Sequence, residues 1–225
     1  MLIRIVRILT FRADTRDYEC LDPRYLVLGL AFTWLVGIGR YWDHPRVEGL
    51  QRLGLGSVAY VFALSALLWL VGLGIKPARW GYLNVLTFVT LTAPPGLLYA
   101  IPVERFLSPE AARTVNLAFL AVVATWRVSL YATYLRRYAV LPVGPLVVQL
   151  LLPLTFIVTA LAALNLEQAV FEVMGGVRAT TSADSAYAFM LALSLLSVIL
   201  FPILAAVYVV MAIQRRRAAQ PGDVA

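Results

Sequence analysis

Long apolar stretches alternate with short charged segments along nearly the whole chain. Runs of about 20 apolar residues are long enough to cross a hydrocarbon core of about 30 Å. The pattern predicts six membrane-spanning helices, at residues 24–40, 55–75, 82–101, 115–135, 141–164 and 187–213. The apolar part of the first, residues 25–39, would reach only roughly 22 Å, so this segment needs flanking arginines that snorkel, or it only dips into the membrane. We therefore expect an all-α, polytopic integral membrane protein, a bundle of about six transmembrane helices.

The first twelve residues follow a different period, with arginines on one side of a helix and aliphatic residues on the other. The polar side holds Arg4, Arg7 and Thr10, and the apolar side holds Leu2, Ile5, Val6, Ile8 and Leu9. This pattern predicts an amphipathic helix in the plane of the membrane surface, with Arg4, Arg7 and Arg12 binding anionic headgroups. The predicted regions are a cytoplasmic helix and connector (1–23), a membrane domain (24–213) and a basic cytoplasmic tail (214–225).

Composition supports a membrane environment. Hydrophobic residues make up 61% of the chain and charged residues only 14%, whereas a soluble domain carries about a quarter charged residues. The net charge is +7, but the basic residues stand at the ends of apolar runs, where they match anionic lipid headgroups rather than nucleic acid. The single cysteine, Cys20, excludes a disulfide within the chain and a cysteine-based zinc motif. We expect no metal and no cofactor.

The lysines and arginines predict the orientation in the membrane. With the N-terminus inside, the cytoplasmic side holds twelve of them: Arg4, Arg7, Arg12, Arg16, Arg24, Lys76, Arg79, Arg136, Arg137, Arg215, Arg216 and Arg217. The outer side holds six: Arg40, Arg46, Arg52, Arg105, Arg113 and Arg178. This excess predicts that both termini are cytoplasmic. The abundance of arginine and alanine suggests a bacterial protein, and hence the inner membrane.

Prolines predict where the helices are interrupted. Pro94, Pro95 and Gly96 stand in the middle of the third predicted span, where two adjacent prolines remove two backbone donors and force a kink or a break. Further prolines, Pro145, Pro153 and Pro202, predict bends in the fifth and sixth spans. Ser108 and Pro109 predict a capped helix start. Broken helices are typical of transporters, but kinked helices also occur in small membrane proteins with no transport role.

Arg127 is the one charged residue deep inside a predicted span, roughly 4 Å from the bilayer centre. An arginine at that depth costs about 2.5–3.5 kcal/mol on insertion scales. Its helical stripe holds Asn116, Leu120, Val123, Arg127, Tyr131 and Tyr134, and this polar enrichment predicts that the stripe faces protein. Arg127 then has two interpretations. It is structural, snorkelling towards the cytoplasm or pairing with carbonyls freed by the helix break, or it binds an anion or a lipid headgroup together with Trp126, Tyr131 and Asn116.

The segment around the only histidine is the candidate for catalysis. Asp43, His44 and Glu48 combine residue types suited to general-base or zinc chemistry. Pro45 disfavours one continuous helix here, and a metal would need further ligands, such as Glu104 or Glu110. The simpler interpretation is a solvated loop beside the aromatic anchors Tyr41 and Trp42. All twelve acidic residues lie outside the predicted spans, which argues against an intramembrane aspartyl protease and against ion-coupled transport.

Three hypotheses for function follow. The leading one is a non-catalytic scaffold, assembly or regulatory subunit of a membrane complex, in contact with lipid and with a partner membrane protein or a second copy of itself. The first alternative is a channel or carrier for an anionic or amphipathic small molecule, using Arg127 near the break at Pro94 and Pro95. The second alternative is an interfacial enzyme that uses Asp43, His44 and Glu48 on a lipid-linked substrate.

Overall fold

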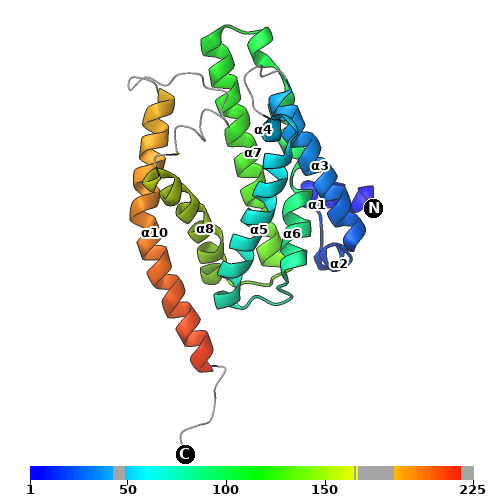
Figure 1. The fold of residues 1–225 in the computed structure, drawn as a ribbon. Coiled ribbons are helices and arrows are strands. Elements are labelled where there is room, and N and C mark those ends of the chain that lie inside the picture. Colours follow the sequence, from blue (N-terminus) through cyan, green and yellow to red (C-terminus); the bar gives the residue numbers. More distant parts are fainter. Residues whose placement is uncertain (43–48, 165, 167–184, 219–225) are drawn as a thin grey trace, which may run out of the picture.

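A computed structural model describes residues 1–42, 49–164, 166 and 185–218, and in these parts the chain forms helices and no strand (Figure 1). The α-helices are α1 Leu2–Leu9, α2 Thr15–Glu19, α3 Pro23–Tyr41, α4 Gly49–Arg52, α5 Leu55–Ile75, α6 Tyr82–Leu91, α7 Pro109–Arg137, α8 Val143–Ala163 and α10 Ser185–Ala218. Two 3₁₀ helices, η1 Pro94–Ala100 and η2 Val103–Arg105, follow α6. The all-α prediction is confirmed for the described residues.

Four helices in the described residues are long and apolar enough to cross a membrane: α5, Glu110–Arg137 of α7, α8 and Leu191–Arg217 of α10. The bent pair Tyr82–Leu91 and Pro94–Arg105 makes a fifth span if it counts as one. α3, the first predicted span, is not among them, because glycine, tryptophan and tyrosine dilute its apolar content and Arg24 and Arg40 stand near its ends. The structure thus supports a multi-pass protein with four or five spans.

The third predicted span is broken where the paired prolines stand. α6 ends at Leu91, and the chain continues from Pro94 as η1 with a bend of 42°. The prolines have no N–H to extend the α-helical ladder. Just before the break, the hydroxyl groups of Thr90 and Thr92 donate hydrogen bonds to the carbonyls of Thr87 (2.8 Å) and Val89 (2.7 Å), so these buried polar groups are satisfied within the helix.

α3 lies directly against the broken span. A Cβ atom on Gly29 would lie 3.1 Å from the carbonyl carbon of Thr90, and a Cβ atom on Gly96 would lie 2.7 Å from Cγ1 of Val36. Glycine at these two positions therefore allows α3 to approach α6 and η1 more closely than any other residue would. η1 also packs against α7, so the break is enclosed by two helices.

An aromatic cluster fills the centre between α6 and α7. Phe88 and Tyr134 stack with ring centroids 4.2 Å apart, and the ring of Tyr18 meets Tyr134 edge-on at 5.4 Å. Tyr18 comes from α2, far away in sequence, and is only 3% exposed. Ile5 and Ile8 of α1 are also buried. The N-terminal segment is therefore part of the core and not an appendage.

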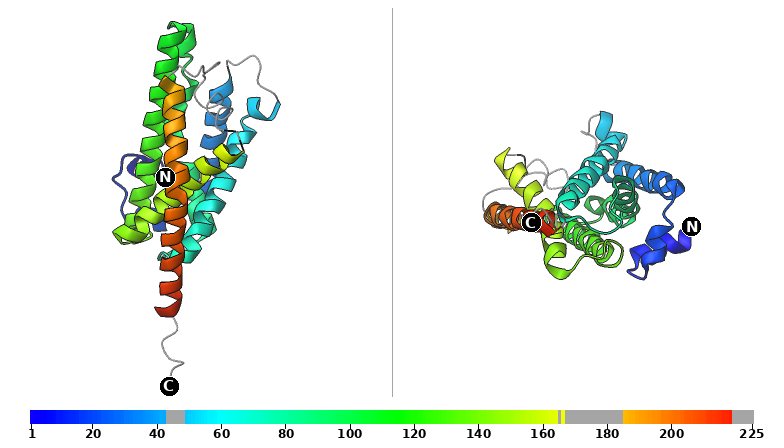
Figure 2. Two further views of the ribbon diagram at one scale, coloured as in Figure 1. Left: turned by 90° about the vertical axis from the view of Figure 1, so that its left-hand side faces the viewer. Right: turned by 90° about the horizontal axis from the view of Figure 1, so that it is seen from below.

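α10 lies at one side of the bundle, opposite α1 and α2 (Figure 2). It contacts α8 and α5 along a stripe that includes Phe201, Leu204 and Tyr208. Pro153 and Pro202 lie inside α8 and α10, and both helices continue past them. The helix start predicted at Ser108 and Pro109 is confirmed: Ser108 caps α7 and accepts a hydrogen bond from the backbone N–H of Ala111 at 3.4 Å.

Candidate functional site

Arg127 lies midway along α7 and is partly buried between the buried residues Val123 and Leu130. Arg137 follows ten residues later, or about 15 Å along the axis. Asn116 precedes Arg127 by eleven residues, or roughly 16 Å, and its amide donates a 2.6 Å hydrogen bond to Glu104. Arg127 is therefore far from the polar residues at both ends of the helix. With the residues that the structure describes, it makes no hydrogen bond and no ion pair.

The residues predicted to join Arg127 in a ligand site have other partners in the structure. Trp126 donates its indole N–H to the carbonyl of Leu9 at 2.9 Å. The Tyr131 hydroxyl accepts a 3.0 Å hydrogen bond from the buried amide of Gln149. Asn116 is committed to Glu104, as above. These three side chains therefore hold α1, α8 and η2 against α7.

A residue that the sequence pattern did not single out, Tyr99 of η1, belongs to the element that packs against α7, the helix of Arg127. Tyr99 is close enough to feel the charges of both Arg127 and Arg40, and the guanidinium carbon of Arg40 stands 5.0 Å from the centroid of its ring. The sequence gives only an indirect indication of this position, since Tyr99 follows the Pro94–Pro95 break by one helical turn. Because the break redirects the chain, the face that Tyr99 occupies could not be derived from helical periodicity.

The C-terminal end of η1 gathers further cationic and aromatic side chains. Trp42 donates its indole N–H to the carbonyl of Ala100 at 2.9 Å, and the guanidinium carbon of Arg105 lies 4.9 Å from the centroid of the Trp42 ring. Cation–π contacts of this kind are attractive and strengthen where water is excluded. Arg40 of α3 and Arg105 of η2 thus contact aromatic rings around η1, and Glu104 of η2 accepts the hydrogen bond from Asn116.

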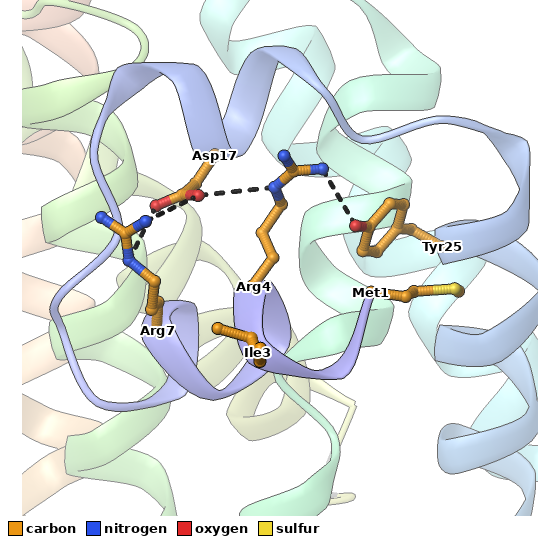
Figure 3. A pocket seen from close by; sticks show the side chains of 6 residues that line it. All are labelled: Met1, Ile3, Arg4, Arg7, Asp17 and Tyr25. Carbon is orange, nitrogen blue, oxygen red and sulfur yellow. Dashed lines mark hydrogen bonds and ion pairs between the residues drawn. The ribbon is translucent and has the colours of Figure 1, made fainter.

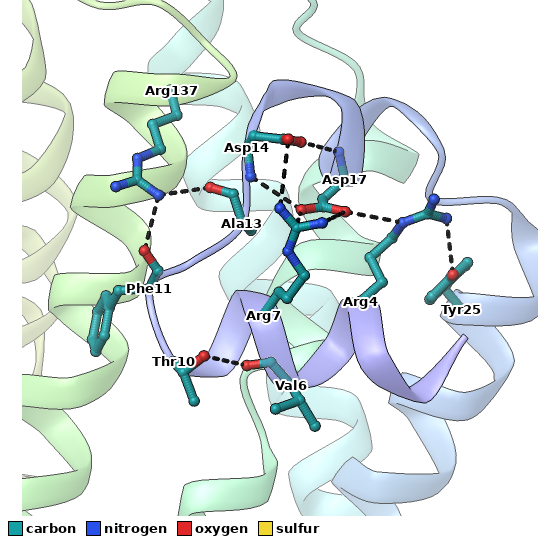
Figure 4. Close-up of polar contacts among 10 residues, drawn as sticks. All are labelled: Arg4, Val6, Arg7, Thr10, Phe11, Ala13, Asp14, Asp17, Tyr25 and Arg137. Atoms are coloured by element: carbon teal, nitrogen blue, oxygen red, sulfur yellow. Dashed lines mark hydrogen bonds and ion pairs between the residues drawn. The ribbon is translucent and has the colours of Figure 1, made fainter.

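A second polar site lies between α1, α2 and α3 (Figure 3). Arg4 and Arg7 share the carboxylate of Asp17, which is 7% exposed, with nitrogen–oxygen distances of 3.4 and 3.3 Å. Arg4 also donates to the hydroxyl of Tyr25 at 3.0 Å. A pocket of about 210 Å³ opens beside these groups, lined also by Met1 and Ile3. Arg4 and Arg7 thus point towards α2, whereas Val6 points away from it (Figure 4).

The segment after α1 is fastened to the end of α7 by Arg137 (Figure 4). Its guanidinium donates to the carbonyls of Phe11 (2.9 Å) and Ala13 (2.6 Å). Phe11 has a φ of 62°, a left-handed conformation that only a few per cent of non-glycine residues adopt. In return, the Thr15 hydroxyl donates to the Arg137 carbonyl at 3.1 Å. We call residues 1–20 with these contacts the N-terminal unit.

Two titratable groups of the N-terminal unit are shifted by their surroundings. Asp14 caps α2, and its carboxylate accepts a hydrogen bond from the backbone N–H of Asp17. This hydrogen bond is the main cause that lowers the pKa of the Asp14 carboxyl. Burial in the aromatic cluster raises the pKa of the Tyr18 hydroxyl to about 12. Arg79 adds an ion pair with Glu19 of 3.0 Å. Arg12, the third arginine predicted to bind headgroups, is exposed.

The predicted catalytic candidates Asp43, His44 and Glu48 lie outside the described residues, so the interfacial-enzyme hypothesis stays a prediction. Of their proposed helpers, Glu104 is bonded to Asn116, and Glu110 stands in the first turn of α7. Within the ranges that the structure covers, no group of three or more histidine, cysteine, aspartate or glutamate side chains could hold a metal ion.

Comparisons with protein-family models, with curated proteins and with solved structures gave no match to this chain. Function is therefore inferred from the residues and their geometry. What these support directly is an all-helical protein with several helices long and apolar enough to span a membrane.

Proposed function

We propose that the protein is a non-catalytic scaffold or assembly subunit of a membrane complex, and that α10 is the helix that contacts its partner membrane protein. The observation that carries this proposal is the exposure of α10. Large apolar side chains project from it away from the bundle: Leu191, Leu193, Leu195, Leu196, Val198, Ile199, Ile203, Val207, Val209, Val210 and Ile213. Only one stripe of α10 packs on α5 and α8, so most of its circumference is available to another helix.

The proposed topology places both termini in the cytoplasm of a bacterial inner membrane, with α3 as the sixth span. The contacts at one end of the bundle support this orientation, because they bring cationic residues together there. Arg215 at the end of α10 donates to the carbonyl of Lys76 after α5 at 3.3 Å, and Arg79 pairs with Glu19. Arg137 at the end of α7 holds the N-terminal unit at the same end. Clustered lysine and arginine are typical of the cytoplasmic side.

We further propose that α1 lies within the cytoplasmic boundary of the membrane. Leu2, Ile3 and Val6 are 66%, 80% and 56% exposed, which is costly in water and favourable in the acyl region. Arg4 and Arg7 turn the other way, towards Asp17. This division of side chains suits a helix whose aliphatic groups enter the lipid while its arginines reach back to the polar boundary.

The docking proposal is tested with photo-crosslinking amino acids placed along α10. The full chain is purified from its native membrane with a crosslinker at Ile199 or Ile203, which are exposed, or at Phe201, which faces the bundle. We expect Ile199 and Ile203 to crosslink one protein of defined mass in stoichiometric yield, and Phe201 to crosslink only within the chain. Lipid adducts alone at Ile199 and Ile203 would contradict a partner-binding α10.

A second candidate function is a channel or carrier for anionic small molecules. It is favoured by the charge of Arg127, which makes no ion pair with a described residue, and by the packing of its helix, α7, against η1 of the broken span. Under this hypothesis, Arg127→Ala abolishes anion flux in reconstituted vesicles. Wild-type protein that passes no anion above the empty-vesicle rate would exclude it.

A further inference from the structure

The pocket between α1, α2 and α3 has a polar side and an apolar edge (Figure 3). Its polar side is formed by Arg4, Arg7, Asp17 and Tyr25, and its apolar edge by Met1 and Ile3. The volume of about 210 Å³ is smaller than the roughly 300–1,000 Å³ of pockets that enclose a whole drug-sized ligand. The pocket therefore suits one small polar group, with the remainder of a larger ligand outside it.

Asp17 positions the two arginines, and both of its carboxylate oxygens are engaged. Oδ1 accepts hydrogen bonds from Nε of Arg4 and Nη1 of Arg7, each at 3.4 Å. Oδ2 accepts from the backbone N–H of Asp14 at 3.1 Å and lies 3.3 Å from Nε of Arg7. One carboxylate thus fixes two guanidinium groups, and the residues that line the pocket keep one positive charge in excess.

The two guanidinium groups can bind a further acceptor. Arg4 donates through Nε to Asp17 and through Nη1 to the Tyr25 hydroxyl and a backbone carbonyl, whereas its Nη2 group makes no hydrogen bond with a described residue. Nη2 of Arg7 lies 3.5 Å from Asp14, whose side chain is 58% exposed, so water screens this pair. The side chains of Arg4 and Arg7 are 31% and 43% exposed, and a ligand can therefore reach both.

A buried phenol supplies one more donor. Tyr25 is only 5% exposed, and its oxygen accepts the hydrogen bond from Arg4 at 3.0 Å. Its own O–H group donates to no described residue, and a donor without an acceptor is unfavourable in a buried side chain. An oxyanion in the pocket would accept from this phenol and from paired guanidinium N–H groups, an arrangement that matches the oxygens of a phosphate.

The apolar edge of the pocket favours a lipid over a free anion. Ile3 and Met1 are 80% and 51% exposed, and they stand beside the groups that suit a phosphate. Free phosphate would leave both side chains uncovered. The glycerol and acyl part of a phospholipid would cover them, which is favourable by about 25 cal/mol for each Å² of apolar surface buried.

We propose that this pocket binds the phosphate headgroup of one anionic phospholipid of the cytoplasmic leaflet. Arg4 and Arg7 neutralise the phosphate, Tyr25 donates a hydrogen bond to it, and Ile3 contacts the acyl end. The inference rests on the proposed position of α1 at the membrane boundary and is independent of a partner for α10, because no residue of α10 lines the pocket. Arg12, predicted from the sequence to bind headgroups, does not line it either.

The test is native mass spectrometry of the full chain, delipidated in detergent and free of phosphate. The probes are dioctanoyl phosphatidic acid, dioctanoylglycerol, which has the same acyl chains without the phosphate, and inorganic phosphate. The variants are Arg4→Gln and Tyr25→Phe. Arg12→Gln is the matched control, since Arg12 is an exposed arginine of the N-terminal unit outside the pocket. The measurement needs neither a membrane nor a partner, so its failure is distinct from a failure of docking at α10.

We expect one phosphatidic acid to bind per chain, more tightly than dioctanoylglycerol and without displacement by an equal concentration of inorganic phosphate. Arg4→Gln should weaken binding by about 5- to 50-fold and Tyr25→Phe by roughly 3- to 10-fold, the range for charged and neutral hydrogen bonds, while Arg12→Gln leaves it unchanged.

Four results would overturn the proposal. Equal binding of phosphatidic acid and dioctanoylglycerol would exclude recognition of the phosphate. Unchanged binding in Arg4→Gln or in Tyr25→Phe would exclude the pocket, and Tyr25→Phe, which keeps the ring, decides alone if Arg4→Gln does not fold. An equal loss in Arg12→Gln and Arg4→Gln would indicate diffuse attraction to the arginines. Displacement by an equal concentration of inorganic phosphate would exclude a lipid as the ligand.

Discussion

The attachment of the N-terminal unit to α7 gives the sharpest prediction, because one side chain makes two of the contacts. Arg137 donates to the carbonyls of Phe11 and Ala13 at 2.9 and 2.6 Å. The substitution Arg137→Gln removes the guanidinium while keeping a polar side chain of moderate length. The backbone of α7 stays the same, so the hydrogen bond from the Thr15 hydroxyl to the carbonyl of residue 137 is retained.

The size of the effect follows from these two hydrogen bonds. A hydrogen bond to a charged group contributes about 1.5–3 kcal/mol where it is buried. Arg137 is exposed, and water can solvate both carbonyls after the change. We therefore expect Arg137→Gln to destabilise attachment of the N-terminal unit by about 1–3 kcal/mol. Since 1.4 kcal/mol is a factor of ten, the detached population should rise by about 5- to 150-fold.

Limited proteolysis of the full chain in lipid nanodiscs measures this population. Trypsin cleaves after Arg12 or Arg16 when the connector detaches, and the rate follows the detached fraction when reattachment is faster than cleavage. Arg136→Gln is the control, because this neighbouring arginine is exposed and also loses its charge. If Arg137→Gln is cut at the wild-type rate, or no faster than Arg136→Gln, Arg137 does not hold the N-terminal unit.

Three further predictions concern other contacts. Gly29→Ala should lower the free energy of unfolding by about 1–3 kcal/mol in a denaturant titration, because its Cβ atom would overlap Thr90; Gly56→Ala, where the new atom meets nothing within 4 Å, is the control and should not destabilise. Since burial raises the pKa of Tyr18 to about 12 from an unfolded value of about 10, its folded form retains the proton, so stability is complete below about pH 10 and falls as the pH rises to about 12. The anisotropy of a fluorophore on Cys20 should therefore fall over this pH range, and Tyr18→Phe should remove that step. Finally, a membrane-impermeant maleimide should label Cys20 in inverted inner-membrane vesicles and not in intact cells; the reverse result would contradict the proposed orientation.

Much of the architecture follows from local chemistry in the sequence. Two adjacent prolines interrupt an α-helix wherever they occur in it. The break at Pro94 can therefore be predicted without knowing which helices pack around it. The amphipathic period of residues 2–9 likewise separates Arg4 and Arg7 from the aliphatic side. The period does not predict what each face of this helix packs against. Ile5 and Ile8 are buried in the bundle, whereas Val6 stays exposed.

The contacts that build the candidate sites join residues distant in sequence, and this is why the pattern did not reveal them. Asn116, Trp126 and Tyr131 share α7 with Arg127, and helical spacing therefore grouped them with it. Each instead reaches a different neighbouring element. η1, which holds Tyr99, packs against α7 after the chain changes direction at Pro94 and Pro95. Pairings of this kind depend on how helices pack, which single-sequence periodicity does not encode.

The hydrogen bonds of Arg137 have a consequence for how the protein is made. The carbonyl of Ala13 and its donor are 124 residues apart, so the ribosome must add this length of chain before the bonds can form. At about 5–20 residues per second, that takes about 6–25 s. During this interval Ile5, Ile8 and Tyr18 have no α7 to cover them. The apolar side chains of the nascent N-terminus are then exposed beside the translocon, and lipid or a chaperone has to cover them until α7 has been synthesised.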